Sequence, residues 1–152
     1  MRPSSLFLIL NGVLILLTGC NTPTPLASSG KSKKEYFTGG KLRTEFILQD
    51  ESRQNGTYKA YDYDGNLMSI TPMQNGLPHG TATTYDPKGR IIAKTHYLNG
   101  QKEGKEEAYY PNGDVMISYT YRHGLKEGPA YSYNKDGSVH KKVIYANDKI
   151  IN

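Results

Sequence analysis

The side chains of this chain that could do chemistry are mainly carboxylates, and their spacing does not indicate an active site. Four glutamates lie close together in the sequence, at Glu103, Glu106, Glu107 and Glu127. Paired carboxylates can act as general acid and base, but only where they converge in a protected pocket. Charged residues at strand ends and in loops are usually solvated, so we interpret these glutamates as surface groups.

The four histidines show no arrangement that is typical of a metal site. They are His79, His96, His123 and His140, and no two of them have the close spacing of metal ligands. The chain also lacks a Gly-x-Ser-x-Gly elbow and a phosphate-binding loop. We therefore predict that the protein is not an enzyme and uses no metal and no cofactor.

The single cysteine follows an apolar N-terminal segment, which gives it a different meaning. Arg2 precedes Leu6–Leu17, a run of 12 mostly apolar residues. As a helix this run is about 18 Å long, too short for a hydrocarbon core of about 30 Å. The letters LTGC then end at Cys20 and resemble the lipobox of a bacterial lipoprotein signal peptide. The resemblance implies that residues 1–19 are removed and that Cys20 carries the lipid anchor.

The residues after Cys20 predict a destination and a tether. Position 21 is Asn21 rather than Asp. The usual lipoprotein sorting pattern then implies the outer membrane, on its periplasmic side, if the host has two membranes. Residues 20–35 are rich in Pro, Ser, Thr and Gly and have no apolar period, so we expect a flexible tether. Its closing lysines could add only a weak attraction to anionic headgroups.

The rest of the chain is built on a repeat of 24 residues. Each unit opens with glycine and has tyrosine five residues later. These positions are Gly56, Gly80, Gly104 and Gly128, with Tyr61, Tyr85, Tyr109 and Tyr133. A fixed period of this length predicts an array in which each unit packs on its neighbours. It favours an extended binding surface over a single catalytic pocket.

Each unit is predicted to be a β-hairpin. In the first unit, Thr57–Tyr63 and Leu67–Gln74 are the expected strands, and residues 64–66 the turn between them. Asn-Gly and Asp-Gly pairs supply the positive φ of primed hairpin turns. Pro72 cannot donate a ladder hydrogen bond, so we expect a bulge or irregularity there.

The return strands alternate with a period of two, which predicts one better-buried face. In the first unit this face carries Leu67, Ser69, Thr71 and Met73, and the equivalent residues follow in the other units. Thirteen tyrosines and no tryptophan suit a thin, half-exposed sheet of roughly 40 Å. We predict an all-β repeat domain over residues 36–152, an elongated twisted antiparallel sheet with a degenerate cap (36–55) and repeats 56–79, 80–103, 104–127 and 128–152.

The repeat pattern resembles a known family. Gly-x4-Tyr, a turn with glycine, and Asn-Gly before the next opening glycine are similar to MORN repeat variants of bacterial proteins, over residues 56–152. Among these, the chain most resembles the YwqK-like antitoxin family. The resemblance implies an elongated sheet of hairpins and a role in binding protein or lipid.

Two hypotheses for function follow. The first is a lipid-anchored immunity or antitoxin-like protein that binds a toxin or effector and occludes its active site. The alternative is a structural or lipid-contacting envelope lipoprotein without a toxin partner.

Nucleic acid is not expected as a partner, because the tyrosines follow the repeat and not a basic stripe. Tyrosine and arginine dominate interfaces, and the candidate contacts are Tyr58, Tyr63, Tyr110, Tyr131 and Arg122.

Overall fold

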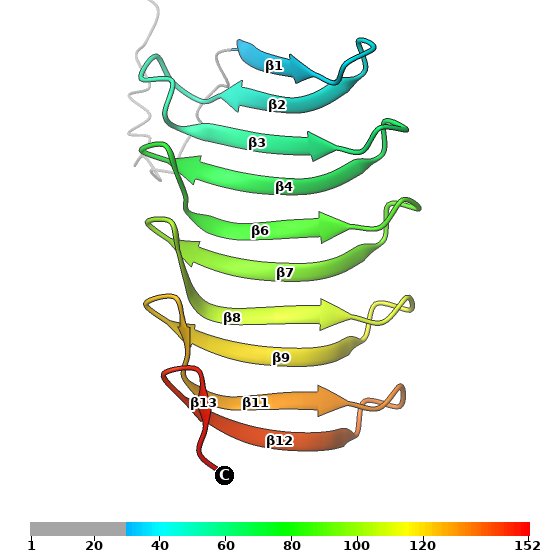
Figure 1. Cartoon of the computed structure of the whole chain (residues 1–152), viewed down its shortest axis with the longest axis vertical. Helices are drawn as coiled ribbons and strands as arrows, with labels where there is room; N and C mark the ends of the chain where they lie inside the picture. The colour runs from blue at the N-terminus through cyan, green and yellow to red at the C-terminus, as the bar shows by residue number, and fades with distance from the viewer. Residues whose placement is uncertain (1–29) are drawn as a thin grey trace, which may run out of the picture.

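The computed structural model describes residues 30–152, which form one antiparallel sheet of thirteen strands. The strands follow one another down the sheet in chain order (Figure 1). The predicted signal peptide, Cys20 and most of the predicted tether lie outside the described residues. Within residues 30–152, no helix has the length and apolarity needed to cross a membrane. The all-β prediction is confirmed.

The sheet is continuous from β1 to β13, and two short strands, β5 and β10, each pair with one strand of the sheet outside this order. Its order is β1-β2-β3-β4-β6-β7-β8-β9-β11-β12-β13, with β5 on β4 and β10 on β9. The strands are β1 (Ser32–Tyr36), β2 (Leu42–Leu48), β3 (Gly56–Tyr61), β4 (Leu67–Gln74), β5 (Leu77–Pro78), β6 (Gly80–Tyr85), β7 (Ile91–Leu98), β8 (Gln101–Tyr109), β9 (Val115–Arg122), β10 (Leu125–Lys126), β11 (Gly128–Tyr133), β12 (Val139–Ala146) and β13 (Lys149–Ile150).

A hairpin of β1 and β2 covers the first repeat, as expected for a degenerate cap. It begins earlier than the sequence suggested, because β1 starts at Ser32 and takes in residues that we assigned to the tether. Every residue of β1 is exposed. Lys33 and Lys34 place positive charge on this outer strand, and charge on an edge strand opposes pairing with another sheet.

The two turns of each repeat lie along opposite edges of the sheet and differ in geometry (Figure 1). In the tight turn after β4, Asn75 and Gly76 both have positive φ, 52° and 76°, as a two-residue primed turn requires. In the wider loop after β3, Gly65 has positive φ, and its N–H donates to the carbonyl of Asp62 at 3.1 Å. That loop is a type I turn followed by a left-handed glycine. The primed geometry that we expected at both turns is therefore found only at the tight turn.

Pro72 does not disturb β4, contrary to the prediction. The strand runs unbroken from Leu67 to Gln74, and Pro72 pairs in register with Thr57. The carbonyl of Pro72 accepts the N–H of His79 at 3.0 Å. The backbone groups of Pro72 therefore point toward the segment between β5 and β6 and not toward β3. The missing N–H therefore costs no bond in the β3–β4 ladder. The register shift of this hairpin lies beside the loop, at Ala60 and Tyr61.

Burial is shallow because the sheet has a single layer. Among the described residues, the buried apolar side chains are Leu48, Tyr121 and Ala130, and none is fully enclosed. The better-buried face predicted for the return strands is confirmed in β7, where Ala93, Thr95 and Tyr97 are half-buried and the residues between them are exposed. It fails beside the loops, where Ile91 and Val139 are 37% and 56% exposed because no second layer covers them.

Candidate binding surface

Alternation along the strands gives the sheet two faces with different side chains. We call one the tyrosine face, since it carries Tyr97, Tyr121 and Tyr145 from one position of the repeat. We call the other the lysine face, and a row of directly paired residues crosses it from β1 to β12. At about 4.8 Å per strand, this row is roughly 43 Å long. It consists of Lys34, Glu45, Lys59, Ile70, Thr83, Lys94, Glu107, Ser118, Tyr131 and Lys142.

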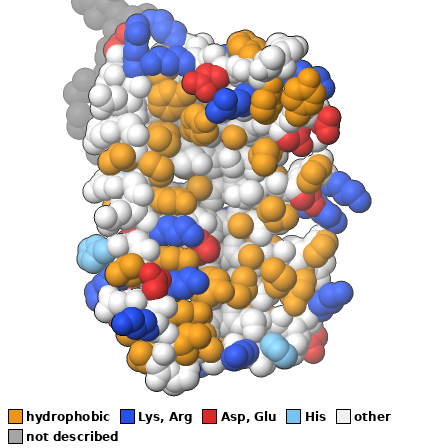
Figure 2. Space-filling model, viewed as in Figure 1, with side chains coloured by type: hydrophobic (Ala, Val, Ile, Leu, Met, Phe, Trp, Pro, Cys, Tyr) orange, Lys and Arg blue, Asp and Glu red, His pale blue; other side chains and the backbone are white. Residues whose placement is uncertain are grey.

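Aromatic rings on the tyrosine face join neighbouring repeats. The ring of Tyr119 meets that of Tyr145 edge to face at 6.1 Å and that of Tyr121 at 6.5 Å. The Lys126 ammonium lies 4.2 Å from the Tyr119 centroid and 5.2 Å from that of Tyr145. Exposed contacts of this kind are worth about 0.5–1 kcal/mol each. Apolar side chains spread along the whole face seen in Figure 2, with charged groups among them.

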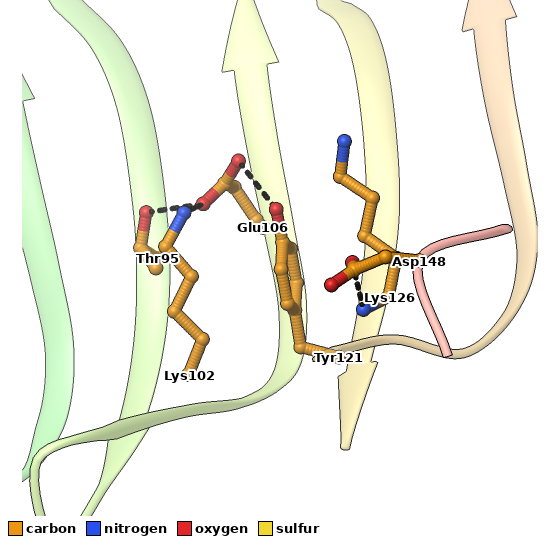
Figure 3. Close-up of polar contacts among 6 residues, drawn as sticks. All are labelled: Thr95, Lys102, Glu106, Tyr121, Lys126 and Asp148. Carbon is orange, nitrogen blue, oxygen red and sulfur yellow. Dashed lines mark hydrogen bonds and ion pairs between the residues drawn. The ribbon is translucent and has the colours of Figure 1, made fainter. Parts of the chain in front are cut away.

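Glu106 is the centre of a polar cluster on the tyrosine face (Figure 3). Its carboxylate accepts hydrogen bonds from the hydroxyls of Thr95, at 3.3 Å, and Tyr121, at 3.5 Å. It also forms an ion pair with Lys102. Figure 3 shows Glu106 between Thr95 and Lys102 on one side and Tyr121 on the other.

The pKa shifts in this cluster favour the protonated forms of Lys102 and Tyr121. Burial alone would lower the pKa of Lys102, but the hydrogen bond and charge of Glu106 outweigh it and raise that pKa. Burial, followed by the charge of Glu106, raises the pKa of Tyr121. A catalytic lysine or tyrosine base requires the opposite shifts. The cluster is therefore suited to holding three strands together.

Glu103 and Glu127 stabilise tight turns of the following repeats. The carboxylate of Glu103 accepts the backbone N–H of His123 at 2.8 Å, and Glu127 accepts that of Asn147 at 3.0 Å. In the first repeat the side-chain oxygen of Asn55 accepts the N–H of Asn75 in the same way. An acceptor thus stands 20 residues before the turn that it holds.

Glu107 has a partner on the lysine face. The Tyr109 hydroxyl donates to Glu107 at 2.8 Å, and the Lys105 ammonium lies 3.7 Å from its other oxygen. Burial, the hydrogen bond to Glu107 and its charge raise the pKa of Tyr109 to about 12. All four glutamates singled out in the sequence are therefore engaged in contacts within the sheet, and are not simply solvated.

The histidines are dispersed over the sheet. The ring of His79 lies 3.3 Å from the Asn99 side-chain oxygen, and that of His96 lies 3.2 Å from the Thr81 hydroxyl. In the part of the chain that the structure describes, no group of three or more His, Cys, Asp or Glu side chains is arranged to hold a metal ion.

The five residues predicted to contact a partner do not share one surface. Tyr131 is a member of the row on the lysine face, and Arg122 lies at the end of β9 on the same face, exposed. Tyr58 lies on the tyrosine face, paired with Thr71.

The other two predicted contact residues, Tyr63 and Tyr110, lie in the wide loops. Tyr63 is 55% exposed and packs edge to face on Phe37 at 5.5 Å. The Tyr110 hydroxyl donates to the backbone carbonyl of Tyr133 at 2.8 Å, which ties two successive hairpins together.

Several basic side chains of the lysine face have no ion-pair partner. Lys34 pairs with Glu45 at 3.5 Å, and Lys105 with Glu107. Within residues 30–152, no carboxylate forms an ion pair with the remaining lysines and arginines of this face, which include Arg43, Lys59, Lys94, Arg122 and Lys142. A shallow hollow of about 600 Å³ lies at the centre of the face, bounded by Thr81, Thr83, Lys94, His96, Lys105 and Glu107.

Sequence reasoning did not select the unpaired lysines as contact candidates, because it favoured tyrosine and arginine as interface residues. The row on the lysine face is made of two variable positions, 11 residues apart in each unit. One holds Lys59, Thr83, Glu107 and Tyr131, and the other holds Ile70, Lys94, Ser118 and Lys142. Aligning the four units with one another and reading these two columns would have located the row.

Comparison with known proteins identifies the repeat. The family described as MORN repeat variant matches residues 54–75, 78–99 and 102–123, three tandem segments that advance by the 24-residue step. The next hairpin, β11–β12, has the same form, although no match covers it. No curated protein matches the chain.

Part of this chain is similar to a chain among the solved structures. It is a mutant of TarM from S. aureus in complex with fondaparinux, alpha-GlcNAc-glycerol and UDP, with 13% identity and a TM-score of 0.46. The similarity covers 66% of this chain and 20% of that chain, so the match spans about a fifth of TarM.

Proposed function

We propose that this array of tandem MORN repeat variants is the protein-binding part of a lipid-anchored envelope protein, which neutralises a toxin or effector by covering its surface. The open, single-layered sheet is the observation that carries the proposal. No second layer lies on either face of residues 30–152. Because large partners bind best on broad surfaces, a sheet of this length is suited to a macromolecule.

The arrangement of polar groups supports binding over catalysis. The four glutamates are used to hold strands and turns, and the described hollows are open to solvent. Catalytic groups are expected to converge in a site that excludes water. A surface that acts by occlusion needs no such site.

Backbone bonds between successive turns support a rigid surface. The N–H of Gly100 donates to the carbonyl of Pro78 at 2.8 Å, and the N–H of Gly124 to that of Lys102 at 2.9 Å. Each tight turn is thereby linked to the preceding repeat. A preorganised surface loses less conformational entropy on binding, which favours tight occlusion of a partner.

The lipid anchor in the proposal depends on Cys20 and the letters before it. Roughly a dozen residues separate Cys20 from the start of β1 at Ser32. A flexible segment of that length has an average reach of about 20 Å. The sheet would then be held close to the membrane, where it could meet an incoming effector.

A deletion experiment tests the toxin hypothesis. The gene is deleted, and the strain is grown alone and in competition with its parent. We expect poor growth or killing by sister cells, and rescue by the full chain expressed from a plasmid. Normal growth together with resistance to sister cells would contradict the proposal.

A second candidate function is a lipid-contacting envelope scaffold, which the unpaired lysines favour. It predicts that the repeat domain without its lipid binds anionic liposomes, and that salt weakens the binding by screening the lysines. Absence of binding at low salt would exclude this candidate.

A further inference from the structure

We infer that the lysine face is the docking face of the sheet and that it fits a partner protein with an acidic surface. The inference rests on the proposed function, since it presumes that the array binds a protein. It adds which face of the sheet binds the partner and the charge of the partner's surface.

Charge compensation differs between the two faces. On the tyrosine face, Lys102 is paired with Glu106, and Lys126 lies over two tyrosine rings. Lys33 and Lys141 of this face are exposed and form no ion pair with any residue that the structure describes. The lysine face carries more exposed cations of this last kind.

On the lysine face, Lys94 and Lys142 are exposed and approach tyrosine rings only at 5.8 Å and 5.7 Å. The charge of Lys142 therefore remains available to a partner, and Arg122 adds another exposed cation at the end of β9. Lys94 lies opposite Glu107 on the next strand, but the ion pair of that carboxylate is with Lys105.

The spacing of the unpaired lysines favours defined contacts over a diffuse field. Lys59 and Lys94 are three strands apart in the row, and Lys94 and Lys142 are four strands apart. At about 4.8 Å per strand these separations are roughly 14 Å and 19 Å. Both exceed the Debye length of about 8 Å at physiological ionic strength. Each lysine then acts separately, and a good partner presents a carboxylate opposite each one.

Variable positions lie on both faces: one position of the tyrosine face holds Ser69, Ala93, Ile117 and Lys141, whereas the variable positions of the lysine face form the row. The glycine that opens each unit is constant, and it is paired with Met73, Tyr97, Tyr121 or Tyr145 on the tyrosine face. On the lysine face, the position of Lys59 holds four different residue types in the four units. A constant frame that carries variable side chains in one row is what recognition of an asymmetric partner requires.

The mixed chemistry of the row favours a protein over a membrane. Glu45 and Glu107 interrupt the lysines, and Thr83 and Ser118 place hydroxyls between them. A carboxylate is repelled by an anionic lipid surface, whereas a folded protein can place a complementary group at each point. The partner that fits is therefore a protein whose surface is acidic but not uniformly so.

The test uses two double charge reversals of equal net charge. Lys94→Glu with Lys142→Glu changes the lysine face, and Lys88→Glu with Lys135→Glu changes two exposed loop residues. Poly-L-glutamate is titrated into the mature chain and both variants at low salt, by calorimetry. We expect at least a tenfold loss of affinity for the lysine-face variant and less than threefold for the loop variant. Equal losses would overturn the inference, because net charge alone would then explain binding.

Two further arms keep the result decisive. If the lysine-face variant unfolds, as judged by its urea midpoint, Lys94→Gln with Lys142→Gln replaces it, and the same affinity ratio is expected. Vesicles of phosphatidylglycerol and phosphatidylethanolamine form the second arm. Tighter binding to vesicles than to poly-L-glutamate, lost in the lysine-face variant, would overturn the inference in favour of a membrane.

The gene deletion, with rescue from a plasmid by the parent chain or by the lysine-face variant, separates this inference from the proposed function. If deletion produces no phenotype while poly-L-glutamate binding depends on Lys94 and Lys142, the toxin hypothesis fails and the docking face stands. If deletion is harmful but the lysine-face variant protects as well as the parent, the docking face is wrong and the proposed function stands.

Discussion

The carboxylate of Glu103 accepts the backbone N–H of His123 at 2.8 Å, although the two residues belong to different repeats. His123 has a φ of 51°, an uncommon conformation for a residue other than glycine. The bond satisfies the donor of a strained turn and links that turn to the preceding unit. This relationship explains an acidic residue that looked like a catalytic candidate in the sequence.

Replacing Glu103 with alanine should therefore destabilise the sheet. The loss of a charge-assisted bond to a partly exposed turn is expected to cost about 1 kcal/mol. The measurement is the free energy of urea unfolding. Glu51→Ala is the control, because its pair with Lys31 is exposed on both sides and should contribute close to nothing. Equal effects of the two substitutions would show that the turn does not need its acceptor.

The opening glycine should respond to alanine differently in different repeats. Gly104 has a φ of 75°, and a Cβ added there would have open space, with His96 as its nearest neighbour at 3.9 Å. Gly104→Ala should cost about 1–2 kcal/mol from backbone strain alone. At Gly56 a Cβ would lie 2.1 Å from the Ile47 carbonyl oxygen, so Gly56→Ala should cost more. Urea unfolding of both variants decides this, and a smaller effect at Gly56 would contradict the structure.

Stability should fall at high pH because of Tyr109. Its pKa is raised to about 12 in the folded protein, against 10.0 for an ordinary tyrosine. The folded state therefore favours the neutral phenol, and the stabilisation is full below pH 10 and is lost as pH rises toward 12. Urea midpoints between pH 8 and pH 11 measure this loss. Tyr109→Phe should flatten the pH dependence, and an unchanged slope in that variant would refute the assignment to Tyr109.

Glu106 and Lys102 should be energetically coupled. A double-mutant cycle with Glu106→Gln and Lys102→Met is expected to give a coupling of about 0.5–1 kcal/mol, since Lys102 is partly exposed and solvent screens the pair. The readout is again urea unfolding. Additive effects of the two substitutions would mean that the ion pair contributes nothing to the fold.

The anchor can be tested at one residue. Cys20→Ser removes the sulfur to which lipid would be attached, so the protein should move from the membrane pellet to the soluble fraction. Fractionation and immunoblotting measure the change, with Ser28→Ala as a control in the tether. Continued pelleting of the Cys20→Ser protein would place the anchor elsewhere.

The repeat could be predicted from the sequence because its constant residues are required by the local backbone conformation of the turns. Gly76 follows Asn75 in a turn that requires two positive φ angles, and such pairs are recognisable in any chain. The 24-residue spacing of these signals then determines the order of the strands.

The surface carries no local signal of this kind, because its residues come together through pairing between strands, and only an alignment of the four units with one another locates the row. Lys59 and Lys94 are far apart in the sequence and are joined through Ile70 and Thr83, whose residue types carry no signal of their own. The prediction for Pro72 failed for a related reason, since the effect of a missing N–H depends on which neighbour it faces.

The most direct test of the central claim is an affinity pull-down of the tagged, lipidated full chain from native envelopes, followed by mass spectrometry. We expect one stoichiometric partner with an acidic surface, such as the product of a neighbouring gene, and its loss when Lys94 and Lys142 are both changed to glutamate. Recovery of bulk lipoproteins and lipid alone, equally with the parent and the variant, would contradict the claim that this sheet binds a dedicated protein.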